Sequence, residues 1–231
     1  MKTLKRIQCL ILVSLVSVFT LSAQEKQEKS QNLDEKLQKS ELVLKDFAAM
    51  KENIPQQLLA KAEGFVVIPG MIKAGLGIGG QHGKGIAIMK KTDGSWSDPV
   101  FITLTGGSVG FQAGVQSIDL VMVFTKGSIL TSLAKGEFTL GGDIGVAAGP
   151  LGRSSSATTD TKFESEVYSY SRSKGLFAGL TLNGSKMATD NAANKAFYQS
   201  DMSAAGIFEK EKGSDHAQVV SLKSMIRGLM Q

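Results

Sequence analysis

The stretch KAGLGIGGQHGKGIAIMKK, residues Lys73 to Lys91, decides how the middle of this chain folds. It matches the dinucleotide-binding pattern G-x-G-x-x-G at Gly75, Gly77 and Gly80. That pattern binds a pyrophosphate only when a helix follows the glycines. Here Gln81-His82-Gly83 predicts a turn, and residues 84–91 predict a second strand. We therefore interpret the glycines as one face of a strand, where a neighbour packs closely or the sheet bends, and expect no cofactor.

Glycine is concentrated in the middle of the chain. Of the 26 glycines among 231 residues, 23 lie between Gly64 and Gly184, whereas the whole chain has only 4 prolines. Together with frequent Val, Ile, Phe and Thr, this composition indicates strands and tight turns and not disorder. The length fits one domain with appendages.

The first 23 residues have the pattern of an export signal. A basic start, an apolar run and a small-residue cleavage site follow one another, at Lys2, Lys5 and Arg6, residues 7–19, and Leu21-Ser22-Ala23. The run is shorter than the ~20 residues of a bilayer span, so cleavage before Gln24 is favoured over an uncleaved anchor. Cys9, the only cysteine, lies too early in the run to carry a lipid anchor. We expect a bacterial protein exported to the periplasm or cell envelope, without disulfides and peripheral on a membrane at most.

Charge excludes one class of partner. The signal contains three of the 26 basic residues, which leaves 23 against 21 acidic residues in the remainder. Because this balance is nearly neutral and no RNA- or DNA-binding motif is present, we expect no nucleic-acid partner.

The remaining chain divides into three parts. We predict a polar tether over residues 24–31, a domain over 32–200 and an amphipathic helical tail over 201–231. Helices are predicted over 32–52, from Pro55 to Gly64, over 128–134 and 190–198, and after Ser214 or Asp215. Strands are predicted over 65–68, 74–80, 84–91, 100–105, 108–115, 119–124, 138–148, 162–172 and 175–183. A turn is predicted at Gly106-Gly107, and the last two strands are predicted to form a final hairpin that turns at Ser173-Lys174.

No arrangement of catalytic residues is apparent. Gly106 to Gly110 match the G-x-S-x-G nucleophile elbow around Ser108, but a strand and not a helix is predicted to follow. The only histidines, His82 and His216, lie in a predicted turn and a charged tail. No Cys/His metal cluster is present, and the alternating Glu164 and Glu166 indicate the solvent face of a strand. We expect no enzyme activity and no metal.

Four long stretches together resemble the SYLF domain family, which is described for lipid and actin binding. They are AEGFVVIPGMIKAGLGIGGQHGKGIAIMKK, SWSDPVFITLTGGSVGFQAGVQSIDLVMVF, GEFTLGGDIGVAAGPLGR and YSYSRSKGLFAGLTLNGS. The resemblance implies an α+β fold, with a mostly antiparallel, strongly curved or barrel-like sheet and flanking helices. It implies lipid binding without a settled catalytic motif. Phosphoinositides and actin, partners of eukaryotic relatives, are improbable for an exported chain.

Five basic residues lie beside predicted strand ends or turns inside these stretches: Lys73, Lys84, Arg153, Arg172 and Lys174. If the sheet curls so that these ends converge, the residues form a rim for lipid headgroups. The alternative is scattered, solvated charge. The C-terminal helix, with its stripe of Val219, Leu222, Met225, Ile226, Leu229 and Met230, either lies in a membrane interface or packs on the domain.

The leading hypothesis is a non-enzymatic phospholipid-binding module of the bacterial cell envelope, acting through apolar contact and attraction to headgroups. The alternative is an envelope structural or assembly protein that binds other envelope proteins through a sheet edge or the 32–52 helix. An unrecognised enzyme is the third hypothesis.

Overall fold

The computed structural model describes residues 31–50, 54–149, 163–173, 176–177 and 182–230. Its helices are a helix over residues 31–49, α2 (Gln56–Ala60), α3 (Gly127–Ala134), α4 (Asn191–Tyr198), α5 (Ala204–Glu209) and α6 (Ala217–Leu229). Its strands are β1 (Gly64–Met89), β2 (Val100–Phe124), β3 (Glu137–Thr139), β4 (Val146–Ala148), β5 (Val167–Ser173), β6 (Leu176–Phe177) and β7 (Lys186–Thr189).

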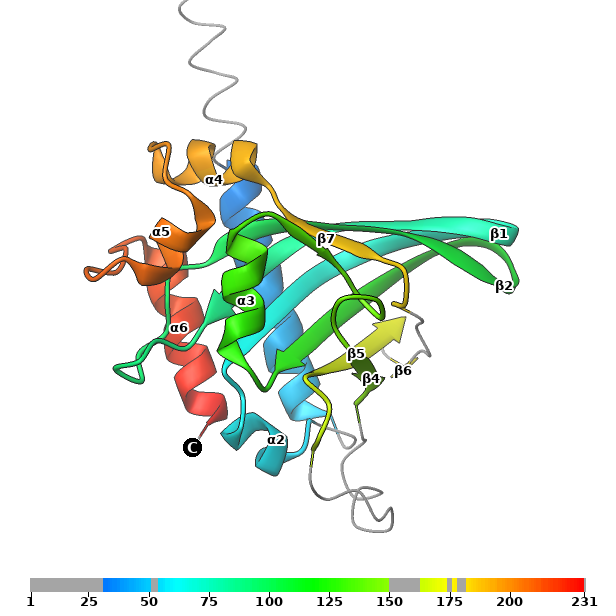
Figure 1. Cartoon of the computed structure of the whole chain (residues 1–231), viewed down its shortest axis with the longest axis horizontal. Coiled ribbons are helices and arrows are strands. Elements are labelled where there is room, and N and C mark those ends of the chain that lie inside the picture. The colour runs from blue at the N-terminus through cyan, green and yellow to red at the C-terminus, as the bar shows by residue number, and fades with distance from the viewer. Residues whose placement is uncertain (1–30, 51–53, 150–162, 174–175, 178–181, 231) are drawn as a thin grey trace, which may run out of the picture.

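The fold is built on one very long hairpin of β1 and β2. The two strands pair antiparallel from Gly64 opposite Phe124 to Ala87 opposite Val100. Halfway along, the two-stranded ribbon bends back on itself, and this bent end reaches away from the rest of the molecule (Figure 1). At the bend, a Cβ added to Gly75 would lie 2.5 Å from the Gly79 Cα. The prediction of close packing or a bend at these glycines is confirmed.

The turns predicted along this hairpin are wrong. Gln81-His82-Gly83 lies inside β1, and Gly106-Gly107 lies inside β2, so each pair of predicted strands is one continuous strand. Glycine suggested chain reversal at both places. The glycine-rich ribbon instead bends within the pairing of the two strands, with register shifts between Ile68 and Met71 and between Leu76 and Gly77.

The sheet is curved and mostly antiparallel. Its seven strands follow the order β3-β7-β2-β5-β4, with β1 also paired to β2 and β6 to β5, and β4–β5 is the parallel pair. The predicted α+β class with a strongly curved sheet is therefore confirmed. The predicted single strand over 138–148 is wrong, because Gly141 turns the chain with φ +77° between β3 and β4. The predicted final hairpin is present where Arg172 pairs with Phe177.

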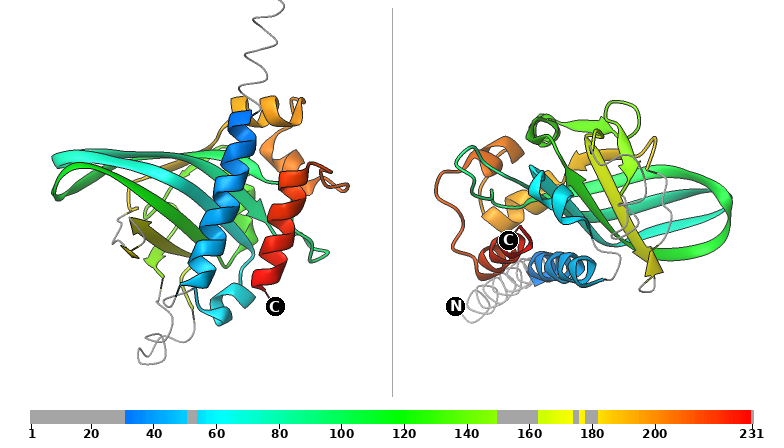
Figure 2. Two further views of the ribbon diagram at one scale, coloured as in Figure 1. Left: turned by 180° about the vertical axis from the view of Figure 1, so that it is seen from behind. Right: turned by 90° about the horizontal axis from the view of Figure 1, so that it is seen from below.

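Two apolar clusters cover the two faces of the sheet. Alternation along β1 sends Val66 and Ile68 into one cluster, and Phe65 and Val67 into the other. The first cluster lies against α3 and α5, and the second lies against the 31–49 helix, α2 and α6. Figure 2 shows the 31–49 helix and α6 side by side over the second face. The hairpin bend lies beyond this helical cover (Figure 1).

The C-terminal helix α6 packs on the domain. Val219, Leu222 and Ile226 are buried in the second cluster. Lys223 forms a buried ion pair with Asp98, which precedes β2. The helix begins with His216 as its N-cap, so the predicted cap at Ser214 or Asp215 is wrong by one or two residues. The Ser214 N–H donates instead to the Asp98 carboxylate.

Helix α4 begins as predicted. The Asp190 side chain accepts a hydrogen bond from the Ala193 N–H at 3.1 Å and so caps the helix. Within the described residues, no helix combines the length and the apolar character that crossing a bilayer requires.

Candidate functional site

The bent end of the β1–β2 hairpin carries large apolar side chains that face solvent. Leu76 is 81% exposed, Ile78 80%, Val115 72% and Ile72 46%. Val115 pairs with Ala74, so it shares a face of the ribbon with Ile72 and Leu76. We call these four residues the tip patch. Grouped exposed apolar side chains on a projecting element are typical of a surface that contacts a membrane or a partner.

The bent end is nearly free of charge. Between Gly70 and Gly83 of β1 the only Lys, Arg, Asp or Glu is Lys73, and β2 has none between Thr105 and Ile118. Lys73 is half-buried and takes part in no ion pair with another described residue. The tip patch therefore has a single uncompensated cation beside it.

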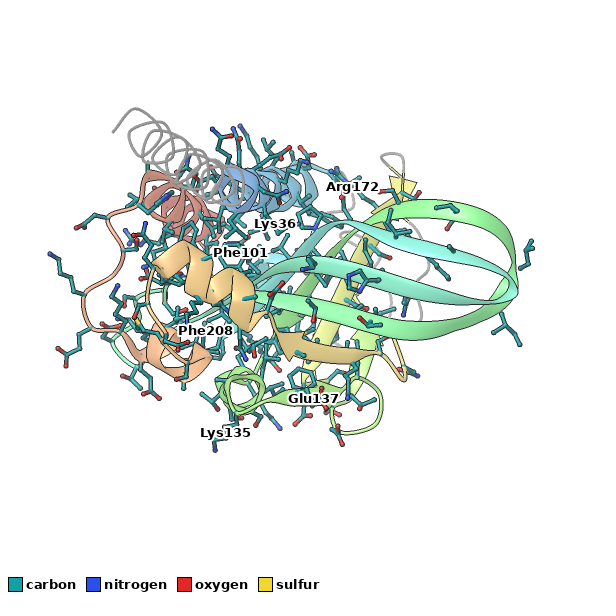
Figure 3. All side chains as sticks on the ribbon, turned by 90° about the horizontal axis from the view of Figure 1, so that it is seen from above. Lys36, Phe101, Lys135, Glu137, Arg172 and Phe208 are labelled. Carbon is teal, nitrogen blue, oxygen red and sulfur yellow. The ribbon has the colours of Figure 1, made fainter. Side chains whose placement is uncertain are left out.

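A second feature is a pair of hollows between the 31–49 helix and the hairpin. The larger has a volume of about 640 Å³, with Lys36, Lys84, Phe101 and Asp190 in its wall. The smaller, of about 400 Å³, has Lys36, Asp119 and Arg172 in its wall. Because Lys36 lines both, the hollows adjoin along the helix, and Figure 3 shows Lys36 with Phe101 and Arg172 to either side.

Lys36 differs electrostatically from the other cations of the hollows. Burial, followed by the positive charges of Lys39 and Lys84, lowers the pKa of Lys36 below its ordinary value. Among the described residues, no carboxylate lies within salt-bridge distance of its ammonium. The fold thus holds a half-buried cation that forms no salt bridge with a described carboxylate, although Glu35 and Asp190 favour its charged form from a greater distance.

Two further cations of the hollows, Lys84 and Arg172, are matched by carboxylates. The Lys84 ammonium lies 2.9 Å from an Asp190 oxygen. The Arg172 guanidinium lies 2.6 Å from Asp46 of the 31–49 helix and 3.1 Å from Asp119. Burial opposes the charged form of Arg172, but hydrogen bonds to Asp46 and Asp119 outweigh it and raise the pKa.

Asp119 joins three parts of the structure at this point. Besides Arg172, it accepts a 2.9 Å hydrogen bond from the N–H of Gly70, which has φ +60° at the bulge of β1. The carboxylate therefore ties the bulge, β5 and, through Arg172, the 31–49 helix together. This gives Arg172 a structural role that its sequence position did not indicate.

The five residues predicted to contact headgroups are distributed as follows. Lys84 and Arg172 line the two adjoining hollows, and Lys73 lies beside the tip patch. Arg153 and Lys174 lie outside the described residues. The contact of these five residues with lipid stays a prediction.

Sequence reasoning missed Lys36 and the tip patch. Lys36 stands between Leu33 and Leu37 at the border of the apolar stripe, which is the signal that could have marked it. Leu76 and Ile78 alternate with glycines along β1. Because the glycines pack on the inner face of the bend, the two apolar side chains point outward from it.

The described residues give no support to the nucleophile motif. Ser108 lies within continuous β2, opposite Gly79, so no strand-to-helix elbow forms around it. His82 contacts Thr105, and His216 contacts Asp34 and the ring of Phe197. Where side chains are described, no three His, Cys, Asp or Glu residues are grouped to hold a metal ion.

Comparison with known proteins agrees with the resemblance seen in the sequence. Residues 105–229 match the Ysc84 family, which is described as "Las17-binding protein actin regulator". This match covers more than half of the chain. The chain belongs to the SYLF (Ysc84) family. Within the matched region lie most of β2 and the whole of α3, α4, α5 and α6.

Two eukaryotic proteins are among the relatives of this SYLF chain. It is 34% identical over 183 residues to human SH3 domain-containing YSC84-like protein 1, covering 76% of this chain and 53% of that protein. It is 38% identical over 148 residues to Protein YSC84 of Saccharomyces cerevisiae, covering 63% of this chain and 31% of that protein. The chain therefore spans about half the length of the human relative and less of the yeast one.

Proposed function

We propose that this SYLF chain is a non-enzymatic module that binds phospholipid membranes by inserting the tip patch. The observation that carries the proposal is the exposure of Leu76 and Ile78, at 81% and 80%, on a hairpin that projects beyond the helices. Full burial of such a side chain stabilises by about 1.5–3 kcal/mol, so the two together provide a useful share of a membrane-binding free energy.

The chemistry of the surrounding residues supports the same function. Inserting a charged group into the interface is costly, and the bent end has only Lys73. A lysine beside an apolar patch can keep its ammonium at headgroup level while its methylenes lie along the apolar surface. Attraction to an anionic membrane adds about 1 kcal/mol for such a residue.

The proposed place of action is the bacterial cell envelope, on the periplasmic surface of a membrane. Support for this comes from the export-signal pattern of residues 1–23. Phospholipid is then the partner that an exported SYLF domain meets, in place of actin or phosphoinositides.

A second candidate function is assembly with an envelope protein. The family description names a protein partner, Las17, and the matched residues 105–229 include the β2 half of the bent end. The tip patch would then be buried against a protein. The predicted use of the first helix for this purpose has less support, because Leu33, Leu37, Leu44 and Phe47 are buried in the domain core.

Co-sedimentation with phosphatidylglycerol/phosphatidylcholine vesicles tests the first candidate. Leu76→Ser with Ile78→Ser should reduce the bound fraction, corresponding to at least a tenfold weaker partition coefficient, because about 1.4 kcal/mol is a factor of ten. Val220→Ser is the matched control, since Val220 is exposed by 52% but lies on α6. If the tip variant sediments like the wild type, the membrane function is wrong, and pull-down from envelope extracts tests the assembly function.

A further inference from the structure

The larger hollow is placed and lined as a binding site for a small anion. It is bounded by the 31–49 helix, β1, β2 and the first turn of α4, through Lys36, Lys84, Phe101 and Ala192. Its volume of about 640 Å³ falls within the roughly 300–1,000 Å³ of ordinary ligand pockets. It lies on the body of the domain and contains none of the tip-patch residues.

The charges in its wall favour a monoanion. Lys36 and Lys84 face one carboxylate, Asp190, which leaves a net charge of +1 in the lining. Asp190 is already held by Lys84 at 2.9 Å and by the Ala193 N–H at 3.1 Å. Lys36 is therefore the cation with capacity for an added anion, because it forms no salt bridge with a described carboxylate.

The other lining groups favour an anion with substituents. Ala192 and Ala193 belong to the first turn of α4, where the helix dipole favours negative charge. The Ala193 N–H already donates to the capping carboxylate, so it is not available to a ligand. Leu33, Phe101 and Ile102 add apolar surface beside the lysines. A bare inorganic ion would use little of this space, whereas a diester carries groups on both sides of its single charge.

From this arrangement we infer that Lys36, assisted by Lys84 and the first turn of α4, binds a phosphodiester monoanion in the larger hollow. This inference deepens the proposed function, since a phospholipid headgroup and a soluble glycerophosphodiester share this chemistry. The hollow and the tip patch have no residue in common, so each would make its own contact with phospholipid.

Isothermal titration calorimetry at low ionic strength tests the inference. The probes are glycerophosphoglycerol, dihexanoyl-phosphatidylglycerol below its micelle concentration, and inorganic phosphate. Lys36→Met should weaken binding of a diester at least fivefold, and Lys36→Arg should retain it. Lys45→Met is the matched control, because Lys45 is exposed on the same helix and lines neither hollow.

The probes distinguish the sources of the ligand. Binding of both diesters supports a site for the soluble headgroup, and binding of the dihexanoyl lipid alone supports a lipid site. Either inorganic phosphate binding as tightly as the diesters, or Lys36→Met binding like the wild type, overturns the inference. The inference is also overturned if neither diester gives a saturable binding isotherm.

A thermal melt shows whether Lys36→Met remains folded. Its melting temperature should equal or exceed that of the wild type, because the substitution removes a half-buried charge without a salt bridge. A failure of the proposed function can be told apart from a failure of this inference. Leu76→Ser with Ile78→Ser should weaken binding to vesicles but leave binding of the diester unchanged, since neither residue lines the hollow.

Discussion

Gly85 accepts no side chain, because the two halves of β1 lie face to face at this position. An added Cβ would lie 2.0 Å from the Val67 carbonyl oxygen and 2.9 Å from the Ile68 Cα. These are backbone atoms, which cannot rotate away. We expect Gly85→Ala to lower the free energy of unfolding by about 2–3 kcal/mol in urea titration.

Gly107 provides the control in the same hairpin. A Cβ there meets nothing within 4 Å, so Gly107→Ala should change the free energy of unfolding by less than about 0.5 kcal/mol. Equal losses in the two variants would show that the halves of the ribbon do not pack as described.

Lys36 should make stability depend on pH in a predictable direction. Because its pKa is lowered in the folded state, the unfolded chain binds more protons between that value and the ordinary 10.5. The free energy of unfolding of the wild type should therefore rise with pH through this window, relative to Lys36→Met. Below the window, Lys36→Met should be the more stable protein.

Urea titrations of both proteins at neutral pH and near the ordinary pKa measure the difference. If the difference in free energy of unfolding between the wild type and Lys36→Met is the same at both pH values, the Lys36 ammonium is not desolvated in the folded state.

The salt bridges of the candidate site explain why the sequence alone does not reveal which of its cations are paired with carboxylates. Lys84 and Arg172 were identified as basic residues in specific motifs, but their partners Asp190 and Asp46 are 106 and 126 residues away. No local pattern links such residues. Without the partners, a matched cation such as Arg172 looks the same as an unmatched one such as Lys36.

At the scale of elements, α6 is held to the domain by a buried stripe and one buried ion pair. Lys223 is only 11% exposed and its partner Asp98 is not exposed at all. Removing one member of such a pair leaves the other charge buried, which typically costs about 3–5 kcal/mol. Asp98 still accepts a hydrogen bond from the Ser214 N–H, so the cost should lie at the lower end of this range. We expect Lys223→Met to lower the free energy of unfolding by about 3 kcal/mol.

Thermal or urea unfolding of Lys223→Met checks this expectation. Lys212→Met is its control, because the Lys212–Asp215 pair is 4.0 Å apart and nearly fully exposed. If Lys223→Met is as stable as Lys212→Met, α6 does not depend on the buried pair for its position.

Elements with a local signal were predicted well, and those that depend on distant packing were not. Asp190 capping α4 and the apolar stripe of α6 are encoded within one or two turns of helix. The turns predicted at Gln81-His82-Gly83 and Gly106-Gly107 failed because glycine is compatible with both a reversal and a close approach. Which one occurs depends on the opposite half of the ribbon, such as Ile68 and Met71 against Gly83.

For the whole molecule, the division of charge predicts how membrane binding responds to salt. Lys84 and Arg172 are matched by carboxylates, and only Lys73 accompanies the tip patch. Binding should therefore depend mainly on apolar contact. Raising NaCl from about 0.05 M to about 0.5 M should weaken vesicle binding less than tenfold. A loss of several orders of magnitude would instead indicate a broad basic surface.

Insertion of the tip patch is the central claim, and a fluorescence measurement tests it most directly. Cys9 is the only cysteine, so Cys9→Ser with Ile78→Cys allows one dye to be attached at the tip, and Val220→Cys places it on α6. With vesicles carrying quenchers on their acyl chains, the dye at position 78 should shift to the blue and be quenched, and the dye at 220 should not. An unshifted, unquenched dye at position 78 on vesicle-bound protein would contradict the account.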